Sequence, residues 1–306
     1  MGLLKAVVTR LLQSIIVLIG VTFLAFGATF LTGDPASLML GEGATTEEIE
    51  AFRVEMGFDR PILVQYGDFL SRAVRGDFGK SLYFRQSNIE LVMQRVPATV
   101  RLSLVALAGS LVLAIPLGLL AARHRNTWKD TSIMVGGLLG QATPGFWLGL
   151  MLIMVFAVRL KWVPVSGLAG WKSYILPAIS LGTAPLAQNL RMMRSCALEV
   201  MGEDYIKTAR AKGLRESVVM YKHVLKNGLK PVITQVGITL GQFLGTAVVV
   251  ETIFAWPGIG RLAVQSIFTK DFPLLQTVVT FLALGFIVIN LIVDLLYAVV
   301  DPRVRT

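Results

Sequence analysis

The sequence predicts an all-α membrane protein that crosses the bilayer several times. Apolar residues make up 54% of the 306 residues and charged residues only 16%, whereas a soluble domain carries nearer a quarter charged residues. Uncharged runs recur along the chain, and each is near or above the roughly 18 to 20 residues that a helix needs to cross the hydrocarbon layer. A β-barrel is not expected, because apolar and polar residues do not alternate over ten-residue segments. We expect six helical spans, at residues 11–31, 102–122, 131–158, 173–190, 231–250 and 272–293.

The first uncharged run is predicted to be a retained span rather than a cleaved signal. It covers residues 11–31 and follows Lys5 and Arg10, and it is longer than the roughly 7 to 15 residues of a signal-peptide core. Because lysine and arginine favour the cytoplasmic side of short loops, both chain ends are expected in the cytoplasm. The same bias explains the net charge of +10, which in a soluble protein would favour nucleic-acid binding.

The pattern divides the chain into four parts. Residues 1–31 form the cytoplasmic N-terminus and the first span, and residues 32–97 form a small helical subdomain outside the membrane. Residues 98–300 form a five-helix core with a cytoplasmic loop at 199–230, and residues 301–306 form a cytoplasmic tail.

Helix signals support the outer subdomain, which follows a turn at Asp34-Pro35. Thr45 and Glu48 have the spacing of a capping box, and Gly57 is expected to end that helix. A second helix is expected to begin near Pro61 and to end before residue 76. The residues on its predicted buried face are Leu63, Tyr66, Leu70 and Val74.

The basic segment 199–230 lies between the fourth and fifth spans and is expected in the cytoplasm. Its first helix is predicted to be capped by Asp204 and to end at Gly213. A second helix is expected from about residue 216 to residue 227, followed by a return to the bilayer at Gly228 and Pro231. Its predicted buried face holds Val218, Tyr221 and Leu225.

Polar residues inside the spans predict a lined path through the membrane. Gln235 and Gln242 are seven residues apart and therefore share a helix face. Hydrogen bonds between helices are the alternative explanation for such amides. The residues expected along the path are Gln141, Thr143, Gln235, Thr239 and Gln242. Pro177 and Pro185 are expected to break the fourth span.

Two stretches resemble the permease subunits of bacterial ABC importers of the dipeptide, oligopeptide and nickel family. Residues 203–214, EDYIKTARAKGL, resemble the cytoplasmic loop of these permeases that inserts into the ATPase subunit. The general form of that loop begins Glu-Ala-Ala, and this chain has Lys207-Thr208-Ala209 there, as the peptide and nickel branch usually does. Residues 251–261, ETIFAWPGIGR, resemble an element that follows the fifth span in the same family, where an interfacial Trp256 is also expected.

The resemblance implies the fold of a type I ABC importer transmembrane domain in a bacterial inner membrane. It implies ATPase coupling through Glu203, Asp204, Tyr205, Thr208, Ala209, Arg210, Ala211, Gly213 and Leu214. It also implies an outer gate or binding-protein contact at Glu251, Phe254, Trp256, Pro257 and Arg261.

The implied partners are a second homologous permease, two ATP-binding subunits and an extracytoplasmic substrate-binding protein. No cofactor, metal site or catalytic residue is expected on this chain, because ATP and Mg²⁺ are implied to bind the partner subunits and no nucleotide-binding lysine motif occurs. The histidines are His124 and His223, both expected in cytoplasmic loops, and the single Cys196 excludes an internal disulfide.

The cargo implied by the resemblance is a di- or oligopeptide, and nickel or a nickel chelate, glutathione and opines remain alternatives. A different class of function is an ion-coupled secondary transporter, for which Glu251 and Asp294 would be the candidate charges. Such a transporter would carry carboxylates nearer the bilayer midplane and inverted repeats, and the sequence indicates neither.

Overall fold

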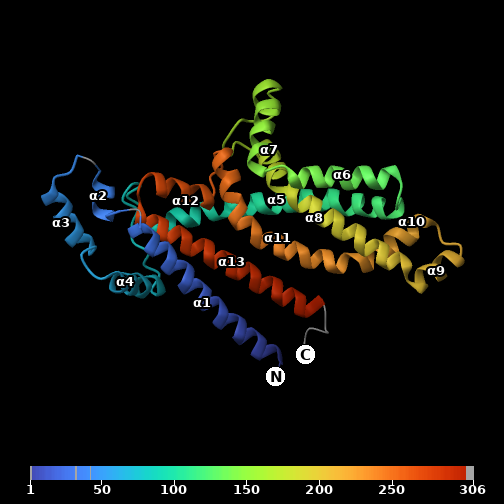
Figure 1. Cartoon of the computed structure of the whole chain (residues 1–306), viewed down its shortest axis with the longest axis horizontal. Helices are drawn as coiled ribbons and strands as arrows, with labels where there is room; N and C mark the ends of the chain where they lie inside the picture. The colour runs from blue at the N-terminus through green and yellow to red at the C-terminus, as the bar shows by residue number, and fades with distance from the viewer. Residues whose placement is uncertain (1, 32, 42, 301–306) are drawn as a thin grey trace. The chain divides into compact units, whose positions relative to one another are not determined.

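The computed structural model describes residues 2–31, 33–41 and 43–300, with side chains at 10, 12–28, 33–41, 43–233 and 235–293 (Figure 1). The described residues are almost entirely helical and form no β-strand beyond one isolated bridge between Lys80 and Ser87. The predicted all-α class is confirmed. The elements are α1 (Gly2–Leu31), α2 (Pro35–Leu40), α3 (Thr46–Met56), α4 (Ile62–Val74), α5 (Asn88–Arg123), α6 (Trp128–Ala142), α7 (Gly145–Leu152), η1 (Ile153–Arg159), η2 (Trp171–Tyr174), α8 (Ile175–Gly202), α9 (Asp204–Ala211), α10 (Glu216–Val218), η3 (Val219–Val224), α11 (Leu225–Ile253), α12 (Ile259–Phe268) and α13 (Phe272–Val300).

Three of the described helices are long and apolar enough to cross a membrane. They cover Asn88–Arg123, Glu216–Ile253 and Phe272–Val293, and the bent pair Trp128–Ala142 and Gly145–Arg159 makes a fourth if it counts as one span. The first predicted span is represented by a shorter apolar helix, Leu12–Ala28. The fourth predicted span lies in α8, which is 28 residues long.

The predicted third span, residues 131–158, corresponds to a bent pair of helices, not to one straight helix. The axis turns by 97° between α6 and α7. Thr143 is extended, with φ −76° and ψ 120°, and Pro144 stands at the N-cap of α7. Proline lacks the amide proton of a helical residue and disfavours helical backbone in the residue before it, so a new helix begins here.

The chain forms two compact units. The first holds the described residues of Met1–Ala98 and Pro257–Val288, and the second holds those of Thr99–Trp256 and Ile289–Thr306.

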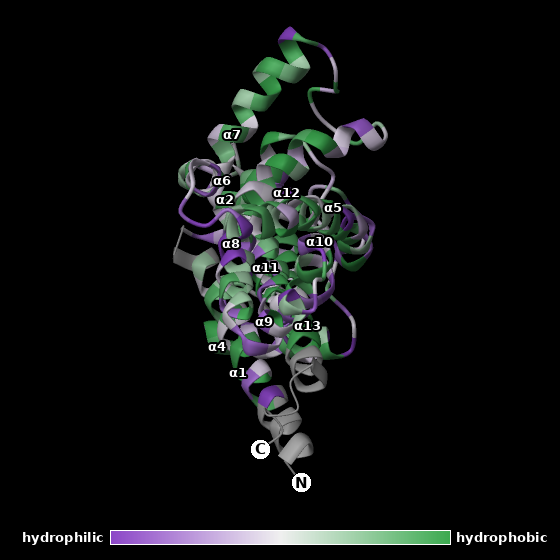
Figure 2. Cartoon of the chain, turned by 90° about the vertical axis from the view of Figure 1, so that its right-hand side faces the viewer, coloured by the Kyte–Doolittle hydropathy of each residue, from purple (hydrophilic) through white to green (hydrophobic). Residues whose placement is uncertain are grey.

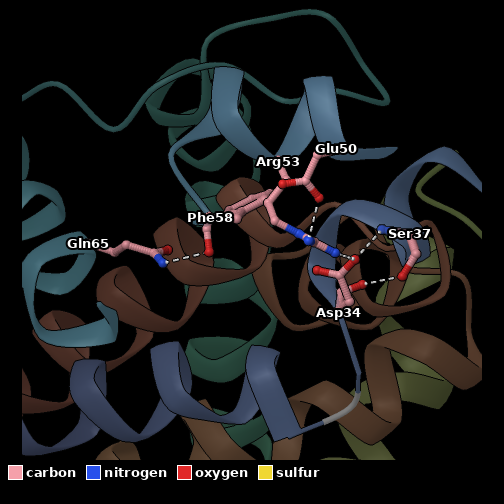
Figure 3. Close-up of polar contacts among 6 residues, drawn as sticks. All are labelled: Asp34, Ser37, Glu50, Arg53, Phe58 and Gln65. Carbon is pink, nitrogen blue, oxygen red and sulfur yellow. Dashed lines mark hydrogen bonds and ion pairs between the residues drawn. The ribbon is translucent and has the colours of Figure 1, made fainter. Parts of the chain in front are cut away.

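In the first unit, local capping determines where α2 and α3 begin and end. Asp34 caps α2 by accepting a hydrogen bond from the Ser37 amide, and its carboxylate also lies 3.0 Å from Arg53 of α3 (Figure 3). The predicted capping box of Thr45 and Glu48 is present, and Gly57 ends α3 with φ +71°, so both predictions are confirmed. Burial alone would raise the pKa of Asp34, but hydrogen bonds from Arg53 and Ser37 outweigh it and lower that pKa.

The helix α4 packs through a different face from the predicted one. Leu63 and Val74 are 71% and 88% exposed, whereas Tyr66 and Phe69 pack on Phe26 of α1. The Tyr66 hydroxyl lies 2.8 Å from Thr22 Oγ1 of α1. This hydrogen bond fixes the rotation of α4, so of the predicted face only Tyr66 is buried and Leu70 partly buried.

In the second unit, α8 packs against α6, α7 and α11 (Figure 1). The predicted break of this helix was wrong, because α8 continues through Pro185. Pro177 lies in the first turn, where a missing amide proton costs no hydrogen bond. Gly182 allows close contact with α5, since a Cβ there would lie 2.9 Å from the Ala106 carbonyl oxygen.

Candidate functional site

The short helix α9 begins at a different residue from the predicted one. Glu203 occupies the N-cap position without a side-chain capping bond, and Asp204 is the first helical residue. The carboxylate of Asp204 accepts a hydrogen bond from Lys207 Nζ over 2.8 Å instead of capping the helix. Gly213 follows with φ +75°, so the predicted left-handed stop is confirmed.

Two apolar residues anchor α9 to the rest of the second unit. Ile206 is fully buried and Ala209 is 8% exposed, and both belong to one apolar cluster. The other buried members of that cluster come from α5, α8, η3 and α11; they are Leu119, Ala122, Met193, Ala197, Val219, Met220, Val224 and Val232. Ala209, expected in the contact with an ATPase, therefore packs inside this chain.

The remaining face of α9 and the turn after it are exposed and mostly polar; Figure 2 colours the chain by hydropathy. Its exposed residues are Glu203, Asp204, Tyr205, Lys207, Thr208, Arg210, Ala211, Lys212, Gly213 and Leu214. Arg210 donates two hydrogen bonds to Glu216, over 2.8 and 3.2 Å. Asn227 donates one to the Tyr205 hydroxyl over 2.9 Å. These contacts hold α9 at a fixed angle to the helix that follows it.

The second predicted helix of this segment starts at Glu216 as expected but does not end at Gly228. It runs without interruption to Ile253, so the predicted stop was wrong. Between residues 216 and 227 its buried residues are Val219, Met220 and Val224, whereas Tyr221 is 64% exposed. The π-helical turn η3 explains the difference, because it adds a residue to the turn and rotates the face predicted from a regular helix.

Two hydrogen-bonded contacts join α8 to the bent pair, one at the first turn of α6 and one at the start of α7. Arg194 of α8 donates hydrogen bonds to both carboxylate oxygens of Asp130, over 2.7 and 2.6 Å. At the bend, Ser180 Oγ donates to the Gly145 carbonyl oxygen over 2.7 Å. Between these contacts, a Cβ on Gly140 would lie 3.0 Å from Thr183, so the two helices are closely packed along this length.

A cavity of about 360 Å³ lies between α7, α8 and α11. Among the predicted path residues, Gln242 lines it. Gln235 and Thr239 do not line the cavity. The side-chain nitrogen of Gln235 lies 3.5 Å from the side-chain oxygen of Gln188, and Thr239 is fully buried. Gln141 and Thr143 lie at the end of α6 and do not line the cavity either. Lining residues not identified from the sequence include Phe146, Ser180, Gln188 and Thr246.

The end of α11 and the stretch after it are buried in part. Glu251, Phe254 and Trp256 are at most 2% exposed, and Glu251 accepts a hydrogen bond from Thr99 Oγ1 over 2.5 Å. The Trp256 ring packs edge-on against Tyr174 with centroids 4.7 Å apart, so this tryptophan is held inside the chain, and its expected interfacial position stays a prediction.

Two further predicted residues of this stretch lie in the first unit. Pro257 and Arg261 belong to the first unit and are partly exposed. The Asp294 side chain and residues 301–306 lie outside the described residues.

Comparison with known proteins identifies the family. The family described as "Binding-protein-dependent transport system inner membrane component" matches residues 114–306. A second family, for the N-terminal part of such membrane components, matches residues 3–103. The chain is also 40% identical over 304 residues to the glutathione transport system permease protein GsiC of Escherichia coli strain K12 and of Shigella dysenteriae serotype 1, covering 99% of each chain.

Solved structures share the fold. The inward-facing MetNI methionine ABC transporter matches 70% of this chain and 97% of its own, with a TM-score of 0.60 and 21% identity. An amino acid ABC transporter with histidines matches 68% and 93%, with a TM-score of 0.52 and 14% identity. The chain therefore belongs to the family of inner-membrane components of binding-protein-dependent transport systems, and it is a non-catalytic permease subunit of an ABC importer.

Proposed function

We propose that this permease imports short peptides or peptide-like solutes such as glutathione by alternating access. It pairs with a second homologous permease chain, with two ATP-binding subunits and with an extracytoplasmic binding protein. Both chain ends lie in the cytoplasm. The observation that carries this proposal is α9, a short helix with an exposed face that Ile206 and Ala209 anchor in an apolar cluster of the second unit.

The geometry of α9 suits docking to an ATPase. One side of this helix is buried against residues of α5, α8 and η3, and the other side is free of contacts with the apolar cluster. A force applied to the exposed side is therefore transmitted to several membrane helices at once. ATP binding to the partner subunits would shift the population between inward-open and outward-open states through this contact.

Peptide cargo is supported by the full-length similarity to glutathione permeases, because glutathione is itself a tripeptide. The polar groups in the cavity add to this support, since Gln188 and Gln242 are amides of the kind that hydrogen-bond peptide groups. Dipeptides, tripeptides and glutathione are therefore the cargo to test first.

The docking proposal is tested by replacing Ala211, an exposed residue of α9, with tryptophan. The variant should insert into the membrane normally but lose co-purification with the ATP-binding subunits and lose peptide uptake. Ser217, an exposed residue of α10, replaced in the same way, serves as the control. Retained uptake and ATPase binding in the Ala211→Trp variant would reject α9 as the docking helix.

The energy source is tested in liposomes that hold this chain without its partners. No accumulation of glutathione or trialanine should follow from an ion gradient alone. Accumulation driven by that gradient would reject the ATP-driven mechanism and favour secondary transport.

A further inference from the structure

We propose that the cavity between α7, α8 and α11 is a binding site that recognises the peptide bonds of the cargo. This inference rests on the proposed function, because it states where a peptide would contact this permease. The cavity volume of about 360 Å³ lies within the range of roughly 300–1,000 Å³ that is typical of small-ligand sites.

Two amide side chains from different helices supply the polar groups of the site. Gln242 of α11 is exposed, and its amide has no hydrogen-bond partner among the described residues. Gln188 of α8 has one contact among them, with Gln235, at 3.5 Å, which is long for a hydrogen bond. A ligand that covers this wall buries both amides, and burying an amide without a partner costs free energy, so the wall favours a ligand that brings donors and acceptors.

The hydroxyl groups that line the cavity already donate hydrogen bonds to backbone carbonyl oxygens. Ser180 donates to the Gly145 carbonyl oxygen and Thr246 donates to the backbone carbonyl oxygen of Gln242. The donors left to a ligand are therefore the two side-chain amide groups, and each of them is an acceptor as well. That combination matches the N–H and C=O of a peptide bond.

The rest of the lining explains why this site would not select for cargo side chains. Phe146, Leu181 and Val249 are apolar, and the lining residues, all within the described part of the chain, include no ionisable group. A lipid acyl chain would leave both amides unpaired. The structure thus assigns the site to short peptides of varied sequence, bound through their backbone.

The test compares trialanine with its depsipeptide, in which an ester oxygen replaces the second amide N–H. The complete transporter is reconstituted in liposomes, and uptake is measured with binding protein carrying equal measured amounts of each compound. Wild type should import trialanine about three- to tenfold faster, the effect of one hydrogen bond. In a Gln188→Leu/Gln242→Leu variant this ratio should fall to about one, whereas Gln13→Leu on α1 should leave it unchanged.

Cross-linking gives a second measurement that does not remove the amides. Benzoylphenylalanine at Phe146, which lines the cavity, should label radioactive trialanine during turnover. The same group at the adjacent Trp147, which is 49% exposed and does not line the cavity, should label it several-fold less.

The outcomes separate this site from the proposed cargo. Unchanged preference for trialanine in the double variant, or equal labelling from positions 146 and 147, overturns the site while peptide transport stands. A wild-type transporter that hydrolyses ATP with loaded binding protein but imports neither compound overturns the peptide cargo and the site together.

Discussion

Arg194 and Asp130 form a bidentate ion pair that joins α8 to the first turn of α6. The Asp130 side chain is 5% exposed and the Arg194 side chain 23%, so water screens the pair less than it screens a surface ion pair. Asp130 also accepts a hydrogen bond from the Asn126 amide over 3.0 Å. The carboxylate therefore orders the turn before α6 as well as the packing of α6 on α8.

Removing the charge of Asp130 should destabilise the permease and weaken its coupling. We expect Asp130→Asn to lower the free energy of unfolding by about 1.5–3 kcal/mol, the contribution of hydrogen bonds to charged groups. Thermal unfolding of the purified transporter measures this loss, and the amount of peptide imported per ATP measures coupling. Lys207→Met breaks the exposed pair with Asp204 and should change the free energy of unfolding by less than about 1 kcal/mol. Equal losses of unfolding free energy in the Asp130→Asn and Lys207→Met variants would contradict the prediction.

Gly118 should not tolerate a methyl group. A Cβ at this position of α5 would lie 2.8 Å from both the Leu190 carbonyl oxygen and Met193 Cβ, so α5 and α8 would have to separate. We expect Gly118→Ala to lower the free energy of unfolding by about 1–3 kcal/mol. Gly109, also in α5, has no neighbour within 4 Å of the place that a Cβ would occupy, and Gly109→Ala should be neutral or stabilising. Chemical denaturation in detergent compares them, and a Gly118→Ala variant as stable as wild type would refute close packing here.

Thr99 should be needed for its hydroxyl group rather than for its shape. Thr99→Val keeps the volume but removes the donor to Glu251, whose side chain is fully buried. The expected loss of unfolding free energy is about 1–3 kcal/mol, because a buried carboxyl group loses a hydrogen bond. Thr99→Ser retains the hydroxyl and should recover most of the melting temperature. Equal melting temperatures for the valine and serine variants would argue against this contact.

The contact between α2 and α3 should weaken in acid. Because the folded state lowers the pKa of Asp34 below its ordinary value of 3.8, its contribution to stability is complete above that value and is lost as the pH falls through the folded pKa. Amide hydrogen exchange in α2, corrected for the intrinsic pH dependence, should rise as the pH is lowered through and below that value. In Arg53→Met, which lacks the partner guanidinium (Figure 3), this rise should begin at higher pH. An unchanged profile would exclude Arg53 as the cause.

Three local signals were reliable because they act within one turn, whereas the predicted cap at Asp204 and the predicted stop at Gly228 failed. The capping box of Thr45 and Glu48, the glycine stop at Gly57 and the stop at Gly213 all occur where the pattern predicted them. The uncharged runs likewise predicted helices, because length and apolar character are enough to require them in a membrane.

The errors arose where packing decides between outcomes that the sequence allows. Proline ends a helix at Pro144 but is accommodated inside α8 at Pro185, and only the neighbouring helices distinguish the two cases. The pair Asp130 and Arg194 is separated by 64 residues, beyond any local pattern. Gln188 is an amide in an uncharged run, as Gln235 and Gln242 are. Its place in the cavity wall depends on how α8 packs against α11, which no local pattern predicts.

The π-turn η3 sets the direction in which each later side chain of the same helix points around the helix axis. A residue added to an α-helix advances the chain by about 100° around its axis, and η3 lies between the anchored end near α9 and Gln242. Shortening this turn by one residue would therefore swing Gln242 through more than a quarter of a circle while the helix kept its hydropathy. A single irregular turn near the start of this helix thus decides which of its side chains face the cavity.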